Sequence, residues 1–390
     1  MDISNLLSEQ RKILKHTPDT FRRYAYDTIN WRNRMICILG PRGVGKTTLV
    51  LQYIKHSSVG GALYYSVDNV LAQGFTLVEL ADEWVKNNGR CLVVDEIHKY
   101  PLWSQELKYI YDSQPELKVI FTGSSVLDIF SGMADLSRRV ALYEMQGLSF
   151  REYLALFHGR IIPMHSLDEI LAHHYELPGI GHPLPLFRDY LRRGYYPFGM
   201  EVDFERKLNQ SVLQTMENDI PVYANMNAST GQKLRRLLTV IANSVPFKPV
   251  LQKLAEEIGV SRNQIADYLL YMERAGMIAQ LRDETGGVRS LGKVEKVYLD
   301  NPNLCIALSS GNPNIGNVRE TFFFNQMRVG HDIVSSKKGD FCVEDLTFEI
   351  GGRNKGQKQV RDVENAYIVR DDMEFGALKN IPLWAFGLTY

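Results

Sequence analysis

The sequence predicts an α/β protein with a parallel sheet, and three observations lead to this fold class. Between residues 35 and 125, short apolar runs alternate with segments whose apolar residues have helical spacing, as in strands joined by crossover helices. A glycine-rich loop separates the first apolar run from the first of these helices. Two later runs end in polar residues, and ligands of parallel sheets bind where the strands end. The sequence therefore predicts a ligand site at one edge of the sheet.

The glycine-rich loop fits the phosphate-binding pattern G-x-x-x-x-G-K-[ST] without a mismatch, which predicts a P-loop NTPase. Residues 35–39 are apolar, as in a buried strand, and residues 48–56 have helical spacing, so the motif has the strand–loop–helix context that it requires. Lys46 would reach the β- and γ-phosphates of a triphosphate, and Thr47 would offer its hydroxyl to Mg²⁺. The residues expected to bind the nucleotide are Gly40, Pro41, Arg42, Gly43, Val44, Gly45, Lys46, Thr47 and Thr48.

The polar residues that end the later runs would complete this site. Asp95 follows the apolar residues 91–94, at the place where a second ligand of Mg²⁺ is expected. Glu96 stands where a carboxylate would orient and deprotonate the attacking water. The same acidic pair could instead cap the next helix, but the phosphate loop upstream favours catalysis. Ser124, or Thr122, would hydrogen-bond the γ-phosphate or the water.

Composition limits the partners of the protein. The chain of 390 residues has 45 basic and 45 acidic residues, so any contact with nucleic acid must come from a local patch. Its four cysteines are far apart and form no C-x-x-C pair, which predicts a reducing compartment. No run of about 18 apolar residues is present to span a bilayer, and the N-terminus lacks the layout of a signal peptide. We therefore expect a cytoplasmic protein without a membrane contact.

Further motifs resemble those of a known family. Residues 95–103, 121–125, 137–140, 147–153 and 193–197 are similar to segments of the AAA+-type ATPases of archaea and bacteria. The group that we mean carries a winged helix and often a restriction-endonuclease-like C-terminal domain. The similarity covers nearly the whole chain, and it implies that the nucleotide is ATP.

The resemblance also implies a catalytic arginine. Arg139 corresponds to the arginine that follows the family's sensor strand, where it would stabilise charge near the γ-phosphate. It would act within its own chain or on a neighbouring subunit of an oligomer. Arg138 stands where the family usually has glycine, so either arginine is a candidate. The alternative role of Arg139 is a surface salt bridge to an acid such as Glu144.

The sequence pattern and the resemblance together predict four domains. These are a P-loop ATPase core at residues 1–149, a helical lid at 150–228, a winged helix at 229–300, and a degenerate endonuclease-like α/β domain at 301–390.

The predicted winged helix would contact DNA through its third helix, which opens with the capping box Ser261-x-x-Gln264. Asp267 and Glu273 dilute the charge of this helix, and winged helices also serve as protein–protein modules or as lids over nucleotides. The side chains on the outward face of the third helix are those of Arg262, Asn263, Gln264, Asp267 and Tyr271.

The C-terminal segment contains part of a nuclease site. The endonuclease-like fold, which this segment resembles, uses an Asp, a Glu and a Lys two residues after the Glu to bind metal and activate water. Asp340 and Glu349 match the first two residues, and Glu320 lies on a preceding helix, but Gly351 stands in the place of the lysine. Without a nearby cation the attacking hydroxide is poorly stabilised. We therefore expect a degenerate site that serves contact with DNA or a partner.

These observations favour one function and leave two others open. We expect a Mg²⁺-dependent ATPase whose reaction moves the lid and the winged helix against DNA or a protein partner. The alternatives are a nucleotide-binding switch without turnover and a metal-dependent nuclease regulated by ATP.

Overall fold

The computed structural model describes residues 3–57, 61–69, 75–123, 136, 138–224, 226–244, 246–284, 292–309, 313–352 and 363–390. The chain divides into two compact units, residues 1–147 and residues 148–390. The first unit ends two residues before the end expected for the ATPase core, at residue 149.

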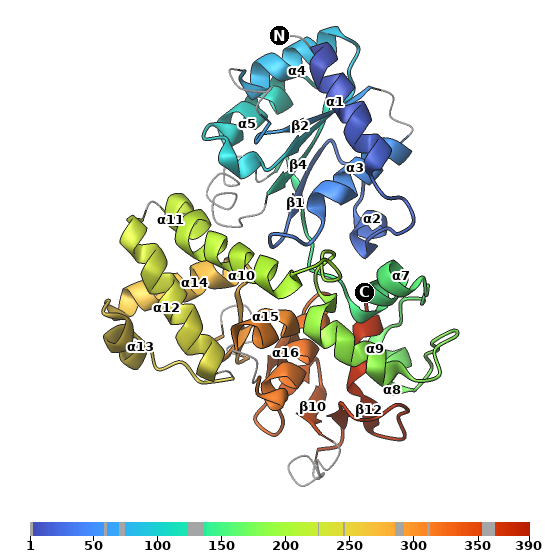
Figure 1. Ribbon diagram of the computed structural model, residues 1–390, viewed down its shortest axis with the longest axis vertical. Helices are drawn as coiled ribbons and strands as arrows, with labels where there is room; N and C mark the ends of the chain where they lie inside the picture. Colours follow the sequence, from blue (N-terminus) through green and yellow to red (C-terminus); the bar gives the residue numbers. More distant parts are fainter. Residues whose placement is uncertain are drawn as a thin grey trace. The chain divides into compact units, whose positions relative to one another are not determined.

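The first unit contains a five-stranded sheet in which neighbouring strands are parallel (Figure 1). The strand order is β2-β3-β4-β1-β5, so β3 and β1, whose ends carry the predicted site, are separated by β4 alone. This confirms the predicted α/β fold of a P-loop NTPase. The strands are β1 (Met35–Leu39), β2 (Ala62–Ser66), β3 (Cys91–Asp95), β4 (Lys118–Gly123) and β5 (Ala141–Glu144).

Helices cover both faces of this sheet, with α3 on one side and α4 and α5 on the other (Figure 1). Leu80, Trp84 and Leu107 of α4 and α5 are buried in one cluster with strand residues such as Cys37 and Val94. The helical spacing of these apolar residues therefore matches the face that each helix buries. The helices are α1 (Ile3–His16), α2 (Tyr24–Thr28), α3 (Lys46–His56), α4 (Leu77–Lys86) and α5 (Trp103–Ser113), with the short 3₁₀ helix η2 (Ile97–Lys99) after β3.

Helix α1 covers the edge strand β2. Gln10 Nε2 donates to the carbonyl of Ala62 at 3.0 Å, and the amide of Tyr64 donates to Gln10 Oε1 at 2.7 Å. Ile3 and Leu6 of the same helix are buried in the core cluster of the sheet. The side chain of Gln10 thus hydrogen-bonds two backbone groups of β2. On an uncovered edge strand, such groups would be free to pair with another chain.

The opposite edge of the sheet is β5, a strand that we did not predict. It has four residues, which alternate between half-buried and exposed, and it pairs with β1. The other four strands were identified by their apolar runs. A strand as short and as exposed to solvent as β5 has no such run.

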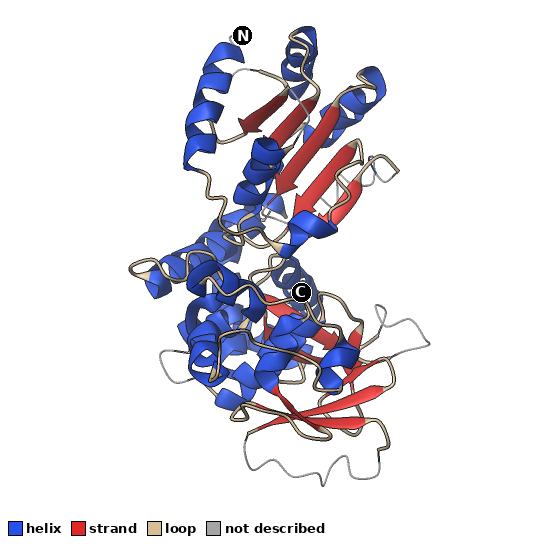
Figure 2. Ribbon diagram, turned by 90° about the vertical axis from the view of Figure 1, so that its right-hand side faces the viewer, coloured by secondary structure: helices blue, strands red, loops and turns tan. Residues whose placement is uncertain are grey.

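Along the chain, the second unit begins with helices and continues with a hairpin and a mixed sheet. Figure 2 shows its helices in blue and its strands in red. The three helices α12, α13 and α14 are followed by the antiparallel hairpin β6–β7, in the order expected for residues 229–300. The second sheet has the order β12-β11-β10-β9-β8, and β9 is antiparallel to both of its neighbours. The sequence at residues 340–343 and 346–350 predicts two paired strands, and the pairing of β9 with β10 confirms this.

The helical elements of this unit are α7 (Phe150–His158), α8 (Leu167–Leu171), α9 (Pro183–Asp189), the π-helix η3 (Tyr190–Gly194), α10 (Phe204–Gln214), the π-helix η4 (Thr215–Asp219), α11 (Ile220–Tyr223), α12 (Ala228–Ser244), α13 (Leu251–Ile258), α14 (Arg262–Arg274), α15 (Pro302–Leu308), α16 (Ile315–Met327) and the 3₁₀ helix η6 (Leu383–Leu388). Its strands are β6 (Ile278–Arg282), β7 (Val294–Leu299), β8 (Ile333–Ser335), β9 (Phe341–Val343), β10 (Leu346–Gly351), β11 (Ala366–Arg370) and β12 (Asn380–Pro382).

The apolar run at residues 382–388 reads as a core strand in the sequence, but that prediction is wrong. The strand β12 ends at Pro382, and the rest of the run forms η6, in which every residue is buried. A continuous apolar run shows neither the period of a helix nor that of a strand. Periodicity therefore cannot decide which of the two a fully buried segment forms. Among the described residues, no helix is long and apolar enough to cross a membrane.

Candidate nucleotide site

The glycines of the phosphate loop have conformations and neighbours that exclude a side chain. Gly43 and Gly45 have φ of 83° and 99°, in the left-handed region that favours glycine. A Cβ on Gly40 would lie 2.2 Å from the carbonyl oxygen of Met145. The loop therefore turns tightly at two points and approaches the neighbouring backbone at a third, and Gly45 directly precedes α3.

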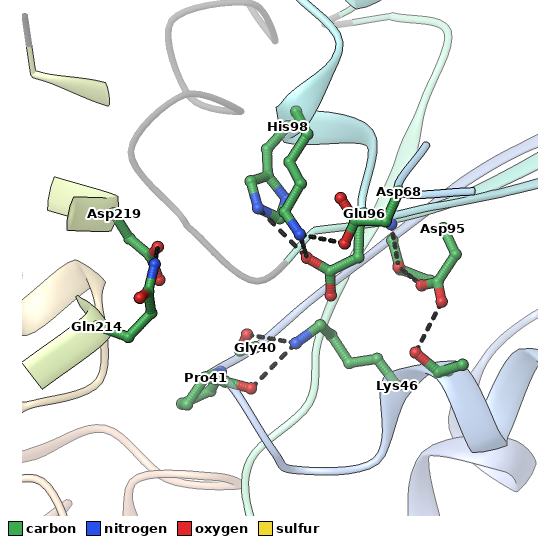
Figure 3. Close-up of polar contacts among 12 residues, drawn as sticks. Gly40, Pro41, Lys46, Asp68, Asp95, Glu96, His98, Gln214 and Asp219 are labelled. Carbon is green, nitrogen blue, oxygen red and sulfur yellow. Dashed lines mark hydrogen bonds and ion pairs between the residues drawn. The ribbon is translucent and has the colours of Figure 1, made fainter. Parts of the chain in front are cut away.

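Lys46 is buried within this loop (Figure 3). Its Nζ donates to the carbonyl of Gly40 at 2.8 Å and to the carbonyl of Pro41 at 3.0 Å. Burial lowers the pKa of Lys46 to about 8, although the carboxylates of Glu96 and Asp95 act to raise it. The ammonium is thus held by two neutral carbonyls in a site that disfavours its charge, and an anion placed there would stabilise it.

Asp95 lies at the end of β3 with its carboxylate surrounded by hydroxyl donors (Figure 3). Thr47 Oγ1 donates to its Oδ2 at 2.7 Å, and Tyr64 OH donates to the same oxygen at 2.8 Å. Thr122 Oγ1 donates to Oδ1. The structure thus brings together Thr47 and Asp95, the two residues predicted to bind Mg²⁺.

Tyr64 is a member of this site that the sequence did not reveal. It lies on β2, and the register pairs it with Val93 of the neighbouring strand β3. Burial and the adjacent Asp95 raise the pKa of its hydroxyl, which therefore stays protonated and donates. Only the order of the strands in the sheet brings this phenol to Asp95, and that order cannot be read from a local motif.

Replacing Tyr64 with phenylalanine is expected to reduce ATP turnover about 3–10-fold, because a buried carboxylate loses one of its fixed donors. The loss should be smaller at high Mg²⁺ concentration. The matched control is Tyr65→Phe, which alters the next residue of β2, a buried ring on the other face of the sheet. Steady-state turnover over a range of Mg²⁺ concentrations tests this prediction, and equal effects of the two variants would contradict it.

Glu96 has a backbone conformation that is uncommon for its residue type. Its φ is 56° and its ψ is 40°, in the left-handed region. Its Oε2 lies 3.3 Å from His98 Nε2 and 3.8 Å from Lys99 Nζ (Figure 3). Burial, with the nearby Lys99 and Lys46, lowers the pKa of His98 to about 3, so this imidazole is neutral. Local strain of this kind is concentrated at functional sites.

Arg23 ties the phosphate loop to the end of the first unit. This residue is buried, and its guanidinium donates to the carbonyl of Val44 in the loop. It also donates to the carbonyls of Gln146 and Gly147, at 2.7 Å and 2.8 Å. One side chain from the N-terminal segment therefore contacts the loop and the last residues of this unit together.

For the other predicted catalytic residues, no contact with the phosphate loop or Asp95 is seen among the described residues. Arg139 makes a bidentate pair with Asp112, with both N···O distances at 3.1 Å. The surface salt bridge considered for this arginine thus exists, but its acid is Asp112 and not Glu144. Arg138 is exposed. Ser124 lies outside the described residues.

Two of the three residues of the predicted nuclease site, Glu320 and Asp340, contact a lysine that the sequence did not reveal. Lys296 Nζ on β7 lies 3.3 Å from both Glu320 Oε2 on α16 and Asp340 Oδ1. Tyr298 OH donates to Glu320 at 2.7 Å. Glu349 is buried in β10. Within the described part of the chain, no group of three or more His, Cys, Asp or Glu side chains is arranged to hold a metal ion.

Replacing Lys296 with methionine is expected to lower the free energy of unfolding by about 1–3 kcal/mol, because two partly buried carboxylates lose their shared cation. Mn²⁺ should restore part of the loss in the variant and have little effect on the wild type. The control is Lys248→Met, since Lys248 pairs with Glu295 at an exposed position. Denaturant unfolding with and without Mn²⁺ tests this, and equal stability of wild type and Lys296→Met would contradict it.

The exposed face of α14 carries the residues predicted to contact DNA. Arg262, Asn263, Gln264 and Asp267 are exposed, and Tyr271 is half-buried. The predicted capping box is confirmed, because Ser261 and Gln264 each bond the backbone amide of the other. Gln264 therefore already uses its side-chain oxygen within the protein.

Comparisons with known proteins agree with the fold of the first unit. Residues 32–154 match a family model described as an AAA domain, and residues 184–314 match a domain of unknown function (DUF8612). No curated protein matches the sequence at a significant level. The first unit thus has the fold of a P-loop NTPase, and most of it is matched by the AAA domain model.

Several solved structures have a distant similarity to the chain. A structure from a study of katanin self-assembly shares 14% identity over 61% of this chain and 71% of its own, with a TM-score of 0.28. AMPPCP-bound DnaA from Aquifex aeolicus shares 13% identity over 70% of this chain and 89% of its own, with a TM-score of 0.27. PCH-2 of C. elegans shares 15% identity over 68% and 67%, with a TM-score of 0.23.

Proposed function

We propose that the protein binds ATP together with Mg²⁺ and hydrolyses it. The observation that carries this proposal is the hydrogen bond of 2.7 Å between Thr47 Oγ1 and Asp95 Oδ2. It joins a hydroxyl at the start of α3, next to the phosphate loop, to a carboxylate at the end of β3. Oxygen ligands suit Mg²⁺, which takes only one or two protein groups when it accompanies nucleotide phosphates. The AAA domain match at residues 32–154 supports ATP as the nucleotide.

The side chains of the site have separate roles in this reaction. Lys46 would exchange its two loop carbonyls for phosphate oxygens, which carry charge and bind the ammonium more strongly. Asp95 would be held by its hydroxyl donors in one orientation. Glu96 would accept the proton of the attacking water. Bound Mg²⁺ would supply neutralisation of the charge on the β- and γ-phosphates.

The neutral state of His98 suits the proposed role of Glu96. A charged imidazole at 3.3 Å would hold the carboxylate in a strong ion pair and would weaken it as a base. Because the pKa of His98 is lowered to about 3, its imidazole is neutral and forms no such ion pair with Glu96. Lys99 is farther away and also pairs with Asp68.

We assign the arginine that stabilises the transition state to Arg138 or Arg139. Arg139 would have to leave Asp112 to reach a phosphate, whereas Arg138 is exposed at the surface. An arginine that acts on the nucleotide of a neighbouring subunit would make the active form an oligomer.

For the second unit we propose a lid at residues 150–228, a winged helix at residues 229–300 that contacts DNA or a protein partner, and an endonuclease-like domain without nuclease activity. The helix–hairpin order of α12 to β7 supports the winged helix. Lys296 supplies a cation between Glu320 and Asp340 that the sequence pattern lacks at Gly351, so the expectation of a site without a nearby cation is wrong. Its ammonium already neutralises the two carboxylates that a metal ion would need, and this supports an inactive domain.

A single-turnover assay with radiolabelled ATP tests the proposal. Release of phosphate in the presence of Mg²⁺ is expected, whereas tight binding without release would establish a nucleotide switch instead. Incubation of the wild type and Asp340→Ala with plasmid DNA and Mn²⁺ tests the nuclease alternative. Cutting by the wild type that is lost in this variant would contradict an inactive C-terminal domain.

A further inference from the structure

A groove in the second unit lies between the helices α13 and α14 and the hairpin β6–β7. Its volume is about 780 Å³, and its walls come from the start of α13, one face of α14 and both strands of the hairpin. Arg262 and Ala266 line it from α14, one helical turn apart. The groove therefore follows a face of α14 that turns toward the hairpin.

The charge of this groove is entirely positive. Arg262, Arg282 and Lys293 line it, and no acidic side chain does so among the described residues. Arg282 lies 3.3 Å from Glu273, which neutralises part of its charge. Arg262 and Lys293 are exposed and form no ion pair within the described part of the chain. Because the whole protein has no net charge, this concentration of cations is a local feature.

The floor of the same groove is apolar. Leu270 and Val294, both half-buried, line it, and Val250 at the start of α13 is 50% exposed. Exposed aliphatic surface inside a concave groove is typical of a site that receives apolar side chains from a partner.

Gln280, which lines the groove, forms two hydrogen bonds with the end of α14. The backbone amide of Gln280 donates to Glu273 Oε1 at 2.8 Å, and its Nε2 donates to Oε2 at 2.7 Å. These bonds join the hairpin to the end of α14. A partner would thus meet a preformed surface, which lowers the entropic cost of binding.

We propose that this groove binds an acidic, aliphatic segment of a partner protein. Its carboxylates would meet Arg262, Arg282 and Lys293, and its aliphatic side chains would cover the floor. Duplex DNA would satisfy the cations but offers no aliphatic side chains to bury the apolar floor, so the lining favours a peptide. This inference rests on the proposed role of residues 229–300 in partner contact, and it names the chemistry of that partner.

The test begins with selection of a random-peptide phage library on the full-length protein, without nucleotide. Selected peptides are expected to combine Asp or Glu with Leu, Ile, Val or Phe. A fluorescent copy of the most enriched peptide is then titrated by anisotropy. The double variant Arg262→Glu, Lys293→Glu should bind it roughly tenfold more weakly or worse.

Two single variants show whether weaker peptide binding comes from a change in the groove or from loss of folding. Val250→Asp removes the exposed aliphatic side chain and adds a negative charge that repels an acidic peptide. Val250 occupies the N-cap position of α13, where Asp is favoured, so the helix should still form. This variant should also weaken binding roughly tenfold. The control is Lys253→Glu, an exposed charge reversal on α13 outside the groove, which should leave affinity unchanged.

Selection of peptides without acidic residues, or equal binding by the double variant, would overturn the inference. Binding of a fluorescent DNA duplex that is lost in the double variant, with no peptide selected, would replace it with a nucleic-acid site. Because no nucleotide is present, these results do not depend on ATP hydrolysis. Peptide binding retained in Lys46→Ala would keep the inference even where the ATPase proposal fails.

Discussion

Replacing Lys46 with alanine is expected to lower the affinity for ATP roughly 100-fold or more, because a buried charge pair to the phosphates is lost. In the structure this ammonium is already buried in the loop, where two carbonyls position it. Isothermal titration calorimetry with Mg²⁺ and a non-hydrolysable ATP analogue measures the effect. The matched control is Lys55→Ala on the same helix, since Lys55 pairs with Asp19 at a half-exposed position. Unchanged affinity in Lys46→Ala would contradict the site.

The lowered pKa of Lys46 adds a signature in pH. Near pH 8 part of the free protein carries a neutral Lys46, since burial lowers its pKa to about 8. Bound phosphates favour the charged form and raise this pKa, so binding should take up protons at about pH 8–9. Titrations in two buffers that differ in ionisation enthalpy measure this uptake. The same uptake in Lys46→Met would show that another group titrates.

Glu96→Gln is expected to bind ATP with nearly unchanged affinity and to hydrolyse it roughly 10²–10⁴-fold more slowly. Glutamine keeps the shape of the side chain but cannot accept the proton of the water. Glu116→Gln is a control, because Glu116 is an exposed acid of the same unit. Single-turnover release of phosphate provides the measurement. Hydrolysis at the wild-type rate would remove Glu96 from the mechanism, although the nucleotide site would still stand.

The core of this site could be predicted because its residues lie in two short motifs, at residues 40–48 and 95–96, that each follow an apolar run. The phosphate loop and Asp95 each follow an apolar strand, and parallel strands bring such ends to one edge. The contact between Thr47 and Asp95 is the result, although 48 positions separate them. Local motifs were therefore enough to predict the site residues at the ends of the two strands that precede these motifs.

The residues that were missed come from strands without a motif. Tyr64 reaches Asp95 because β2 is the neighbour of β3, and Lys296 reaches Glu320 and Asp340 from 24 and 44 positions away. A tyrosine within an apolar strand and a lysine within a hairpin are ordinary residues until the pairing of strands is known. The four-residue β5 was not found because its residues alternate between half-buried and exposed and form no apolar run.

The contacts of the N-terminal segment decide where a stable ATPase fragment can begin. The AAA domain match starts at residue 32, but Gln10 pairs the edge of β2, and Arg23 joins the loop to the last residues of the unit. Truncation at residue 32 would leave a sheet edge open to other copies and would leave the carbonyls of Val44, Gln146 and Gly147 without their donor. Recombinant fragments that retain α1 should stay monodisperse, whereas shorter ones should precipitate.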